Sequence, residues 1–498
     1  MVTERSSNAF DTIRFRGKWW IPDGTENPRK VSGELTFEVS AGGTLELDEA
    51  LSDDIREIAV IHGQGTKGEC ITIFNGFATG LQKATNSMGT FRRETIQFYD
   101  MWVGNQWFDS KEDVRFVSYS FGMHNIENWA DQRCFSIPEP HDTKQESISY
   151  ISPEAIPLFT DGQLSIVLDS FHSGPGMSMG QLESSIQHYP RIVIRSKEEL
   201  LPYYGKNGSL SEREWMIFVL IALSMGVVTW KFGFEGIVQP LKIEDGDYIP
   251  EISVRHYFQH DWGKTDASKH PSVFELLFPY DTFEGQFPAI AARFSEVFRL
   301  NENPIDIVYR LQCRKGIFYP STLPELLFAF EELEKNLFVR LNEPIEATEK
   351  ERITALRKKL TPYCPKTEKE LLSQNLSFRG LSYAQRFRIA FQEMKAIYPE
   401  LGTNLIKPLI DYFRDTRNDY AHAVKSTSND HTRYVFASHW LAEFMTLMVF
   451  RACGLSDDKI KQVFFRNPGP DRGKTKRFFD YLRTSFSPIS QNRCRRRA

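Results

Sequence analysis

Four polar side chains that could act on a phosphate lie close together in the last third of the sequence. Arg414, Arg417, Asn418 and His422 belong to segment 411–423, which is predicted to be helical. A histidine titrates near neutral pH and can remove a proton from a ribose 2′-hydroxyl or return one to a leaving oxygen. An arginine can hold a phosphate and stabilise the charge that grows on it in the transition state. These residue types therefore suit metal-independent cleavage of RNA.

The helical repeat determines how these side chains could meet. Steps of four residues place Arg414, Asn418 and His422 on one face, with Arg417 one position to the side. Arg417 and His422 are five residues apart, about 140° around an ideal helix, so they converge best near a helix end or a distortion. Because one histidine cannot easily act as base and acid together, a second copy of the chain is expected to complete the site. On spacing alone, a solvated helix face or a hydrogen-bonded core histidine explains the same pattern.

The elements around this segment are predicted to be helices. Thr322 is expected to cap a helix that has Pro324 in its first turn, where proline is tolerated. Apolar residues then recur with a helical period. Further helices are expected over the ranges 348–360, 380–398, 404–424 and 432–452. Short connections between these helices indicate an all-α bundle.

The front of the chain is predicted to form strands. Leu35, Phe37 and Val39 alternate with polar residues, as in a half-buried strand. Large flat side chains suited to a pleated face follow at Trp19, Trp20, Trp102, Trp107 and Trp129. Further strands are predicted at Val114–Ser120, Leu164–Leu168 and Arg191–Arg195.

The middle of the chain is expected to mix loops, a strand or two and one buried helix. That helix would begin at 211, with Ser211 and Glu214 forming a capping box. Its apolar run is too short to span a bilayer. The predicted fold class is α+β and multidomain: a β-rich N-terminal domain over 1–300 (β-rich over 1–130, mixed over 130–300), then an all-α helical bundle over 301–498.

Composition and charge indicate an ordinary globular protein. The chain has 498 residues, of which 41% are hydrophobic and 25% are charged, and its net charge is −4. The segment from Arg466 to the C-terminus has ten basic and two acidic residues, so it carries +8 and the remainder −12. Such a tail can attract a phosphate backbone, and a solvated, frayed terminus explains it equally well.

No targeting segment or cysteine framework is expected. The opening MVTERSSNAFDTIRF lacks the architecture of a signal peptide, and the six cysteines include no CxxC pair. A soluble, cytoplasmic protein without membrane contact, metal or cofactor is therefore expected.

Three motifs resemble known sites, but the spacing or the surroundings of each one argue against such a site. The GxGxxG of segment 63–68 leads into a predicted strand, so a hairpin turn is favoured over a dinucleotide loop. Segment 469–475 has one residue too few between its glycines for a phosphate-binding loop. His256 and His260 have zinc-compatible spacing but no evident third ligand, which favours a surface or core pair.

Segment Arg417-Asn-Asp-Tyr-Ala-His422 resembles the RNxxxH form of the Arg-x(4–6)-His motif of HEPN ribonucleases. The flanking segments 328–334 and 381–387 resemble the HEPN domain of the ApeA family of bacterial anti-phage proteins. The four-residue spacer lies at the short end of the family range.

The front of the chain agrees with this family. Segment Phe15-Arg-Gly-Lys-Trp-Trp-Ile-Pro22, followed by Gly33-Glu-Leu and Leu45-Glu-Leu, resembles the opening of the ApeA N-terminal domain. The resemblance covers nearly the whole chain, and 130–300 is its least distinctive part.

The resemblance implies an anti-phage defence effector. Such a protein is a metal-independent endoribonuclease that dimerises through its HEPN bundle and cuts RNA, with tRNA as a candidate, when a phage protein triggers it. Growth of the infected cell then stops by abortive infection. Arg417 would stabilise the phosphate, His422 would act as acid and base, and Asn418 would take the polar position after the arginine.

Other positions are assigned less sharply. Arg414, Lys425 and Arg433 are candidate RNA contacts, because basic side chains near the motif can hold a phosphate backbone. HEPN proteins often place an acidic residue on an earlier helix, and Glu331, Glu332 and Glu334 all lie there, although a salt-bridged helix face explains most of that cluster. Two alternatives remain open: a non-catalytic RNA- or nucleotide-binding module, and an interaction module that senses phage protein.

Overall fold

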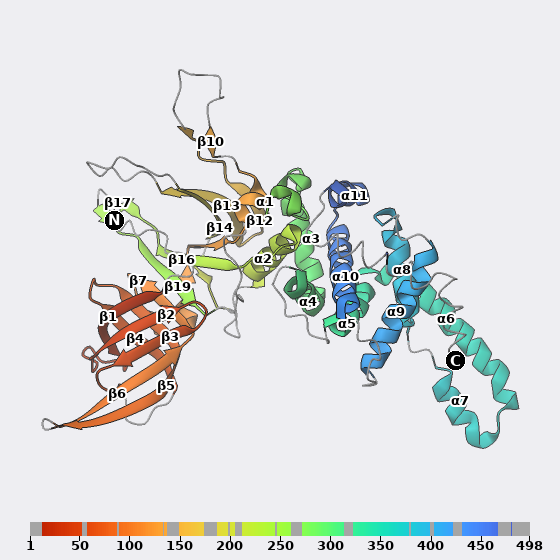
Figure 1. Ribbon diagram of the computed structural model, residues 1–498, viewed down its shortest axis with the longest axis horizontal. Coiled ribbons are helices and arrows are strands. Elements are labelled where there is room, and N and C mark those ends of the chain that lie inside the picture. Colours follow the sequence, from red (N-terminus) through yellow and green to blue (C-terminus); the bar gives the residue numbers. More distant parts are fainter. Residues whose placement is uncertain are drawn as a thin grey trace. The chain divides into compact units, whose positions relative to one another are not determined.

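The computed structural model describes residues 12–51, 57–86, 89–132, 134–136, 149–173, 187–197, 200–204, 212–244, 247–259, 271–312, 322–377, 380–398, 403–421, 431–466 and 480. A β-rich region is followed along the chain by a helical region, which confirms the predicted α+β class (Figure 1). Contacts between Cα atoms divide the chain into two units. One comprises residues 1–218, 228–271 and 285–288, and the other comprises 219–227, 272–284 and 289–498.

The first six strands close into a small antiparallel barrel. They are β1 (Ile13–Trp20), β2 (Val31–Glu38), β3 (Gly42–Leu47), β4 (Glu57–Gly65), β5 (Cys70–Asn86) and β6 (Gly89–Phe98). Each strand pairs with its neighbour in the order β5-β4-β1-β2-β3-β6, and β6 pairs again with β5, which completes the ring. A closed ring leaves fewer unpaired strand edges, where another chain could add.

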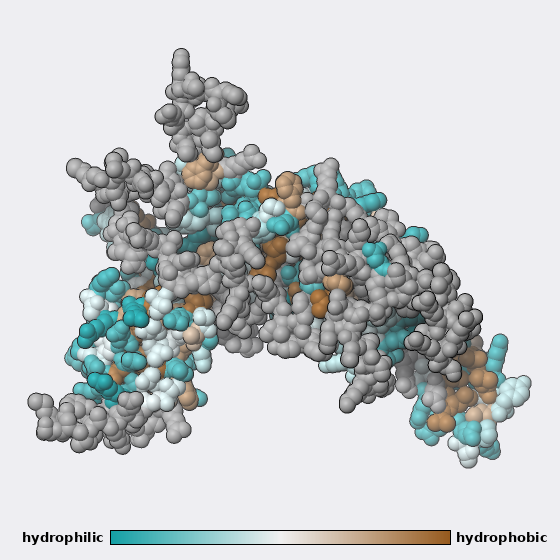
Figure 2. All heavy atoms as spheres, in the orientation of Figure 1, coloured by the Kyte–Doolittle hydropathy of each residue, from teal (hydrophilic) through white to brown (hydrophobic). Residues whose placement is uncertain are grey.

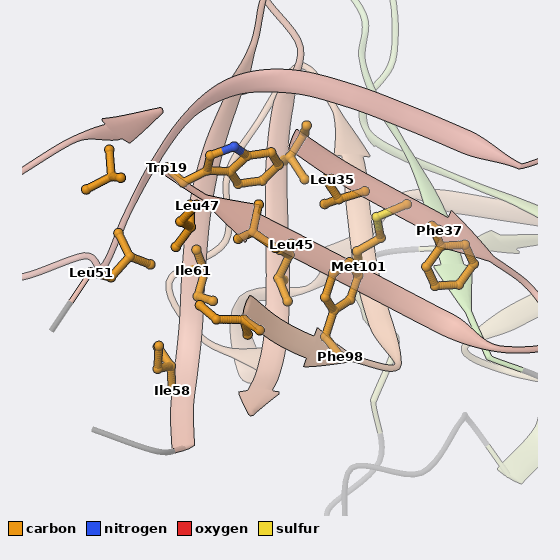
Figure 3. Packing of buried hydrophobic residues seen from close by; sticks show 14 of the residues in the cluster. Trp19, Leu35, Phe37, Leu45, Leu47, Leu51, Ile58, Ile61, Phe98 and Met101 are labelled. Carbon is orange, nitrogen blue, oxygen red and sulfur yellow. The ribbon is translucent and has the colours of Figure 1, made fainter. Parts of the chain in front are cut away.

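Alternating side chains of these strands fill the interior of the barrel (Figure 3). In β2, Leu35 and Phe37 are fully buried while Glu34 and Glu38 are exposed and Thr36 is half-buried, as the alternation predicted. The indole of Trp19 donates a hydrogen bond to the Gly33 carbonyl at 3.2 Å. A Cβ on Gly63 would lie 2.2 Å from the Trp19 ring, so this position must stay small for the ring to fit.

The middle of the chain contains more strand than the sequence suggested. One sheet of thirteen strands includes the barrel and continues in the order β7-β19-β16-β9-β14-β13-β12, which confirms strands overlapping the predicted ranges 114–120, 164–168 and 191–195. These strands are β7 (Asp100–Gly104), β9 (Ser118–Met123), β12 (Ile156–Thr160), β13 (Leu164–Ser173), β14 (Gln187–Ser196), β16 (Lys231–Gln239) and β19 (Ile252–Phe258). The expectation of a strand or two was therefore wrong. Pairings such as β9 with β14 join segments far apart in sequence, and such pairings have no local signature.

Shorter elements complete this region. The remaining strands are β8 (Arg115–Phe116), β10 (Phe135–Ser136), β11 (Ser149–Tyr150), β15 (Leu201–Pro202), β17 (Lys242–Glu244) and β18 (Asp247–Ile249). The 3-10 helix η1 (Lys111–Asp113) and the helix α1 (Ile126–Ala130) lie between strands. Of the tryptophans, Trp19, Trp20, Trp102 and Trp129 are buried and Trp107 is half-buried, so these rings serve mainly as core.

The buried helix predicted near residue 211 is α2 (Glu212–Met225). Its Glu214 was expected to cap the helix with Ser211, which lies outside the described residues. Glu214 accepts a hydrogen bond from Lys231 Nζ at 2.8 Å, and both side chains are at most 2% exposed. The ammonium also lies 5.3 and 4.9 Å from the ring centroids of Trp215 and Phe218, so the aromatic surroundings help to offset its loss of water.

The C-terminal region is built from helices. They are α3 (Phe287–Leu300), α4 (Glu302–Gln312), α5 (Thr322–Leu337), α6 (Val339–Leu360), α7 (Lys369–Asn375), α8 (Tyr383–Glu393), α9 (Thr403–Ala421), α10 (His431–Ala452) and α11 (Asp457–Arg466). The short 3-10 helices η2 (Val273–Glu275) and η3 (Tyr280–Phe283) precede α3, and η4 (Thr361–Tyr363), η5 (Lys366–Glu368) and η6 (Met394–Ala396) lie between the later helices. Within the ranges given above, no helix has both the length and the apolar character needed to cross a bilayer.

A stack of aromatic rings holds four of these helices together. Phe387 of α8 lies between Phe330 of α5 and Phe413 of α9, with centroid distances of 4.0 and 5.3 Å. Phe413 in turn stacks on Trp440 of α10 at 5.8 Å. All four rings are fully buried. This core fixes the side of α9 that faces α5 and α8.

Helices α6 and α7 depart from this pattern, because little of their surface is buried. Asn342 is the only buried residue of α6, and Leu356 and Leu360 are 45% and 40% exposed. Figure 2 shows apolar surface gathered where α6 and α7 meet in Figure 1, and Leu371 of α7 is also exposed.

Candidate active site

Arg417 lies on the side of α9 that faces the bundle. Phe413, one helical turn earlier, is buried between α8 and α10, and the same side of the helix continues to Arg417. Thr416 beside it is also buried, and its hydroxyl donates to the Tyr412 carbonyl of its own helix. The packing of α9 therefore directs Arg417 towards α5 and α8.

Three side chains from those two helices surround the guanidinium. Arg417 Nη2 donates to Glu331 Oε2 at 3.1 Å, and the two side chains are 29% and 34% exposed. The guanidinium carbon lies 5.4 Å from the centroid of the Phe328 ring and 5.6 Å from that of Tyr383. We call Arg417, Glu331, Phe328 and Tyr383 the arginine cradle. An ion pair and two ring faces hold a half-buried cation in one place.

Two hydrogen-bond donors in the arginine cradle have no acceptor among the described residues. They are Arg417 Nε and the Tyr383 hydroxyl, and both atoms are buried. Burial, together with the charge of Glu331, raises the pKa of Tyr383 well above its usual value despite the opposing effect of Arg417, so the hydroxyl keeps its proton. A buried donor without an acceptor costs about 1–3 kcal/mol, so an acceptor brought by a ligand would be bound favourably.

The three candidate glutamates of α5 have different environments. Glu331 is the one that reaches Arg417, while Glu332 is exposed. Glu334 is fully buried and pairs with Arg386 of α8 at 2.9 Å. Burial raises the pKa of Glu334, and the Arg386 guanidinium partly opposes that rise. Glu334 thus belongs to the packing of α5 on α8.

Arg414 and Asn418 lie on another side of α9. Arg414 Nη1 is 2.9 Å from Asp411 Oδ1, and its Nη2 is 2.9 Å from Asp415 Oδ1. Both carboxylates raise the pKa of this guanidinium, with Asp415 contributing most. Asn418 is exposed one turn further along. Arg417, which the helical repeat placed one position to the side of that face, thus has partners different from those of Arg414.

The other predicted site residues are His422, Lys425 and Arg433. His422 and Lys425 lie outside the described residues, directly after α9 ends at Ala421. Arg433 belongs to the first turn of α10, and only its backbone is described. The roles predicted for these three residues remain predictions.

The structure describes segment 63–68 and His256, which belong to the three motifs that only resemble known sites. The 63–68 segment joins β4 to β5 in a hairpin turn with Gly68 at φ +92°, which confirms the predicted turn. His256 lies in strand β19, not on a helix, and its Nε2 is 2.6 Å from Asp100 Oδ1 in a buried network. His260 and segment 469–475 lie outside the described residues. Among the described residues, no three histidine, cysteine or acidic side chains are grouped as a metal site requires.

Sequence reasoning missed the aromatic residues of this site. Phe328 precedes Glu331 by three residues, so both lie on one face of α5, and that spacing could have singled it out. Tyr420 is inside the predicted motif itself, and its ring lies 6.5 Å from that of Phe328. Tyr383 gave no local signal, because only the packing of α8 brings it to Arg417.

Comparison with known proteins finds a similarity at the front of the chain. No curated protein and no solved structure matches the chain significantly. A family model does match: residues 14–200 fit the one described as ApeA N-terminal domain 1. The match begins in β1, covers the barrel and the strands up to β14, and ends before α2. Over these residues, the chain is similar to the N-terminal domain of ApeA.

Proposed function

We propose that this protein is an anti-phage defence effector whose C-terminal bundle is a HEPN-type endoribonuclease. The ApeA N-terminal domain match over residues 14–200 supports the defence role. The RNxxxH motif that starts at Arg417, close to the end of α9, supports the nuclease. Cleavage of cellular RNA, with tRNA as a candidate, would stop growth of an infected cell by abortive infection.

The arginine cradle is the observation that carries this proposal. Arg417 Nε is buried without an acceptor among the described residues and could donate to a ligand, as could Nε of Arg386 in the packing of α5 on α8. The Tyr383 hydroxyl beside Arg417 is a second donor of the cradle in the same condition. Non-bridging phosphate oxygens accept hydrogen bonds from such donors and complement the positive charge. Glu331 meanwhile holds the guanidinium in place.

In the proposed reaction the ribose 2′-oxygen attacks the adjacent phosphorus. His422 removes the 2′-hydroxyl proton, the bond from phosphorus to the 5′-oxygen breaks, and the leaving oxygen takes up a proton. The products are a 2′,3′-cyclic phosphate and a 5′-hydroxyl. Arg417 stabilises the charge that develops on the non-bridging oxygens. Asn418 fixes the tautomer of His422 or contacts the phosphate.

We propose a homodimer because the two proton transfers need two groups. One His422 would serve as base and its counterpart from the partner as acid, in a composite site formed by two bundles. Arg414, Lys425 and Arg433 are proposed to guide the RNA backbone. For Arg414 this requires its guanidinium to bind phosphate while it stays near Asp411 and Asp415. A phage protein is the proposed trigger, and the cytoplasm is the proposed site of action.

The test compares His422→Ala, Arg417→Ala and the wild-type protein for RNA cleavage, RNA binding and toxicity in cells. The proposal predicts that His422→Ala abolishes cleavage and toxicity while binding persists. Arg417→Ala is expected to lose cleavage and to bind more weakly. Full cleavage by His422→Ala would overturn the proposed chemistry.

A non-catalytic RNA-binding module is the second candidate. The ion pair between Arg417 and Glu331 favours this candidate, because a guanidinium already paired with a carboxylate stabilises negative charge on a phosphate less strongly. Such a module would bind RNA without cutting it. Neither His422→Ala nor Arg417→Ala would then remove a cleavage activity or a toxicity that depends on cleavage. The same variants therefore separate the two candidates.

A further inference from the structure

Two large aromatic rings, one in the arginine cradle and one beside it, are exposed to solvent. Phe328 of α5 is 41% exposed and Tyr420 of α9 is 50% exposed. Their centroids are 6.5 Å apart, and the ring planes are inclined by 59°. Phe328 also touches the Arg417 guanidinium, at 5.4 Å. The two rings and the cation therefore form one continuous surface.

The packing of the bundle does not account for these two rings. The interior of the bundle is filled by other aromatic residues, among them Phe330, two positions from Phe328 on the opposite side of α5. A single exposed ring is ordinary on a protein surface. A pair of them, placed next to a half-buried cation with an unused donor, has the composition of sites that bind single-stranded nucleic acid.

We propose that Phe328 and Tyr420 form a nucleobase subsite that stacks an unpaired base of the substrate while Arg417 holds the adjoining phosphate. This inference rests on the proposed function, and it names the class of substrate. Bases in a duplex are stacked on their own neighbours and cannot offer their faces, so the subsite selects loops, single strands and splayed ends. Every base has such a face, so the selection would tolerate sequence changes.

The position of Tyr420 in the sequence supports this assignment. It lies between Arg417 and His422, so the ring that would hold the base and the groups that would act on the phosphate come from one short segment. Placing a base on Tyr420 would therefore also fix the ribose and phosphate with respect to that segment. Restricting the substrate in this way is a recognised source of rate enhancement.

The experiment measures binding of a short RNA that carries 2-aminopurine, as a single strand and as a duplex, to full-length protein. A His422→Ala background prevents cleavage during the measurement. The test variants are Tyr420→Leu and Phe328→Leu, which keep an apolar side chain but lose the ring. Tyr420→Phe restores a ring, and Tyr363→Leu is a matched control because Tyr363 of η4 is 87% exposed and forms no part of the cradle.

The subsite predicts quenching of the 2-aminopurine fluorescence when the single strand binds. Both leucine variants should bind it at least about fivefold more weakly and lose the quenching. Tyr420→Phe and Tyr363→Leu should behave as the parent does, and the duplex should bind weakly to all variants. Tyr420→Leu is the cleaner test, because Tyr420 has no cation–π contact with Arg417 that its loss would disturb.

Several results would overturn the subsite: no binding of the single strand, unchanged affinity and quenching in Tyr420→Leu, or an equal loss with the duplex. These outcomes are distinct from failure of the proposed function. Ring-dependent binding by a wild-type protein that never cleaves RNA would reject the nuclease and keep the subsite. Cleavage that needs Arg417 and His422 but not the two rings would reject the subsite and keep the nuclease.

Discussion

At the scale of single residues, Arg417 and Arg414 show how far a helical repeat can be read. Both are arginines on α9, three positions apart, yet Arg414 is committed to Asp411 and Asp415 while Arg417 enters the arginine cradle. The sequence identified both as basic side chains on a helix. It could not tell which one faced the bundle, because that depends on how Phe413 packs between α8 and α10.

Arg417→Lys is expected to lower the kcat/KM of RNA cleavage by about 100-fold or more, because an ammonium cannot reproduce the planar fork that contacts a phosphate. Arg414→Lys, the matched control on the same helix, should change it by less than about threefold, since lysine keeps the positive charge with which Arg414 is proposed to guide the RNA. Initial rates on a labelled RNA provide the comparison. Equal losses in the two variants would contradict the assignment of Arg417.

Glu331 is a positioning residue in this account, and Glu331→Gln should lower kcat by about 10- to 100-fold because the guanidinium loses its fixed orientation. RNA affinity should stay the same or increase, since a negative charge near the phosphate has been removed. Glu332→Gln, on the same helix but exposed, should leave both quantities unchanged. Steady-state kinetics and a binding titration separate the two effects, and a pure loss of affinity in Glu331→Gln would be contrary to expectation.

At the scale of elements, the positions of the predicted helices were easier to read than their contacts, although α3, α4, α7 and α11 were not predicted. Helices α9 and α10 begin and end within a few residues of the ranges expected from apolar spacing. The pairing of Glu334 with Arg386 was not foreseen, because the two residues lie 52 positions apart and meet only when α5 packs on α8. The strands of the middle region were underestimated for the same reason.

Glu334→Ala is expected to lower the free energy of unfolding by about 3 kcal/mol, because it leaves a buried guanidinium whose remaining carboxylate, Glu346, is 3.7 Å away. Urea unfolding followed by circular dichroism measures the change in the helical signal. Glu332→Ala is the control and should stay within about 0.5 kcal/mol of wild type. A loss below about 1 kcal/mol in Glu334→Ala would show that the pair is not essential to the packing.

The N-terminal unit should lose stability in acid through Asp100 of β7. Burial alone would raise the pKa of this carboxyl, but His256, Tyr204 and Lys111 stabilise the carboxylate and lower its pKa below 3.8 in the folded state. Because the folded pKa is depressed, its contribution is complete above the unfolded pKa and is lost as the pH falls below about 4.

Asp100→Asn should therefore show a shallower fall of the urea midpoint with decreasing pH than wild type does. Tryptophan fluorescence of the full-length protein can follow this transition, since Trp102 stacks on His256 in the same network. Asp109→Asn is the control, because the Asp109 side chain is 82% exposed. An identical slope for Asp100→Asn and wild type would exclude the proposed role of this carboxylate.

At the scale of the whole molecule, the order of a β-rich region followed by helices could be read from the sequence. Alternation along β2 and helical spacing in α5 are local signals, and both were correct. Closure of the barrel could not be read, because it depends on β6 pairing with both β3 and β5. The dimer proposed from the chemistry of His422 is likewise a property of the assembly, not of any one segment.

Light scattering of the purified full-length protein should give twice the mass of one chain. Specific cleavage activity should fall on dilution below the dimer dissociation constant, because each composite site needs both copies. A monomer with undiminished specific activity at every dilution would contradict the composite site and require a second proton-transfer group within one chain.

The central claim is that an arginine and a histidine cleave RNA without a metal ion, and the ends of the fragments test it most directly. Purified protein would be incubated with total tRNA in EDTA, and the termini of the products identified. The account predicts 2′,3′-cyclic phosphate and 5′-hydroxyl ends, formed by wild type and absent with His422→Ala. Cleavage that strictly requires Mg²⁺, or that leaves 5′-phosphate ends, would contradict it.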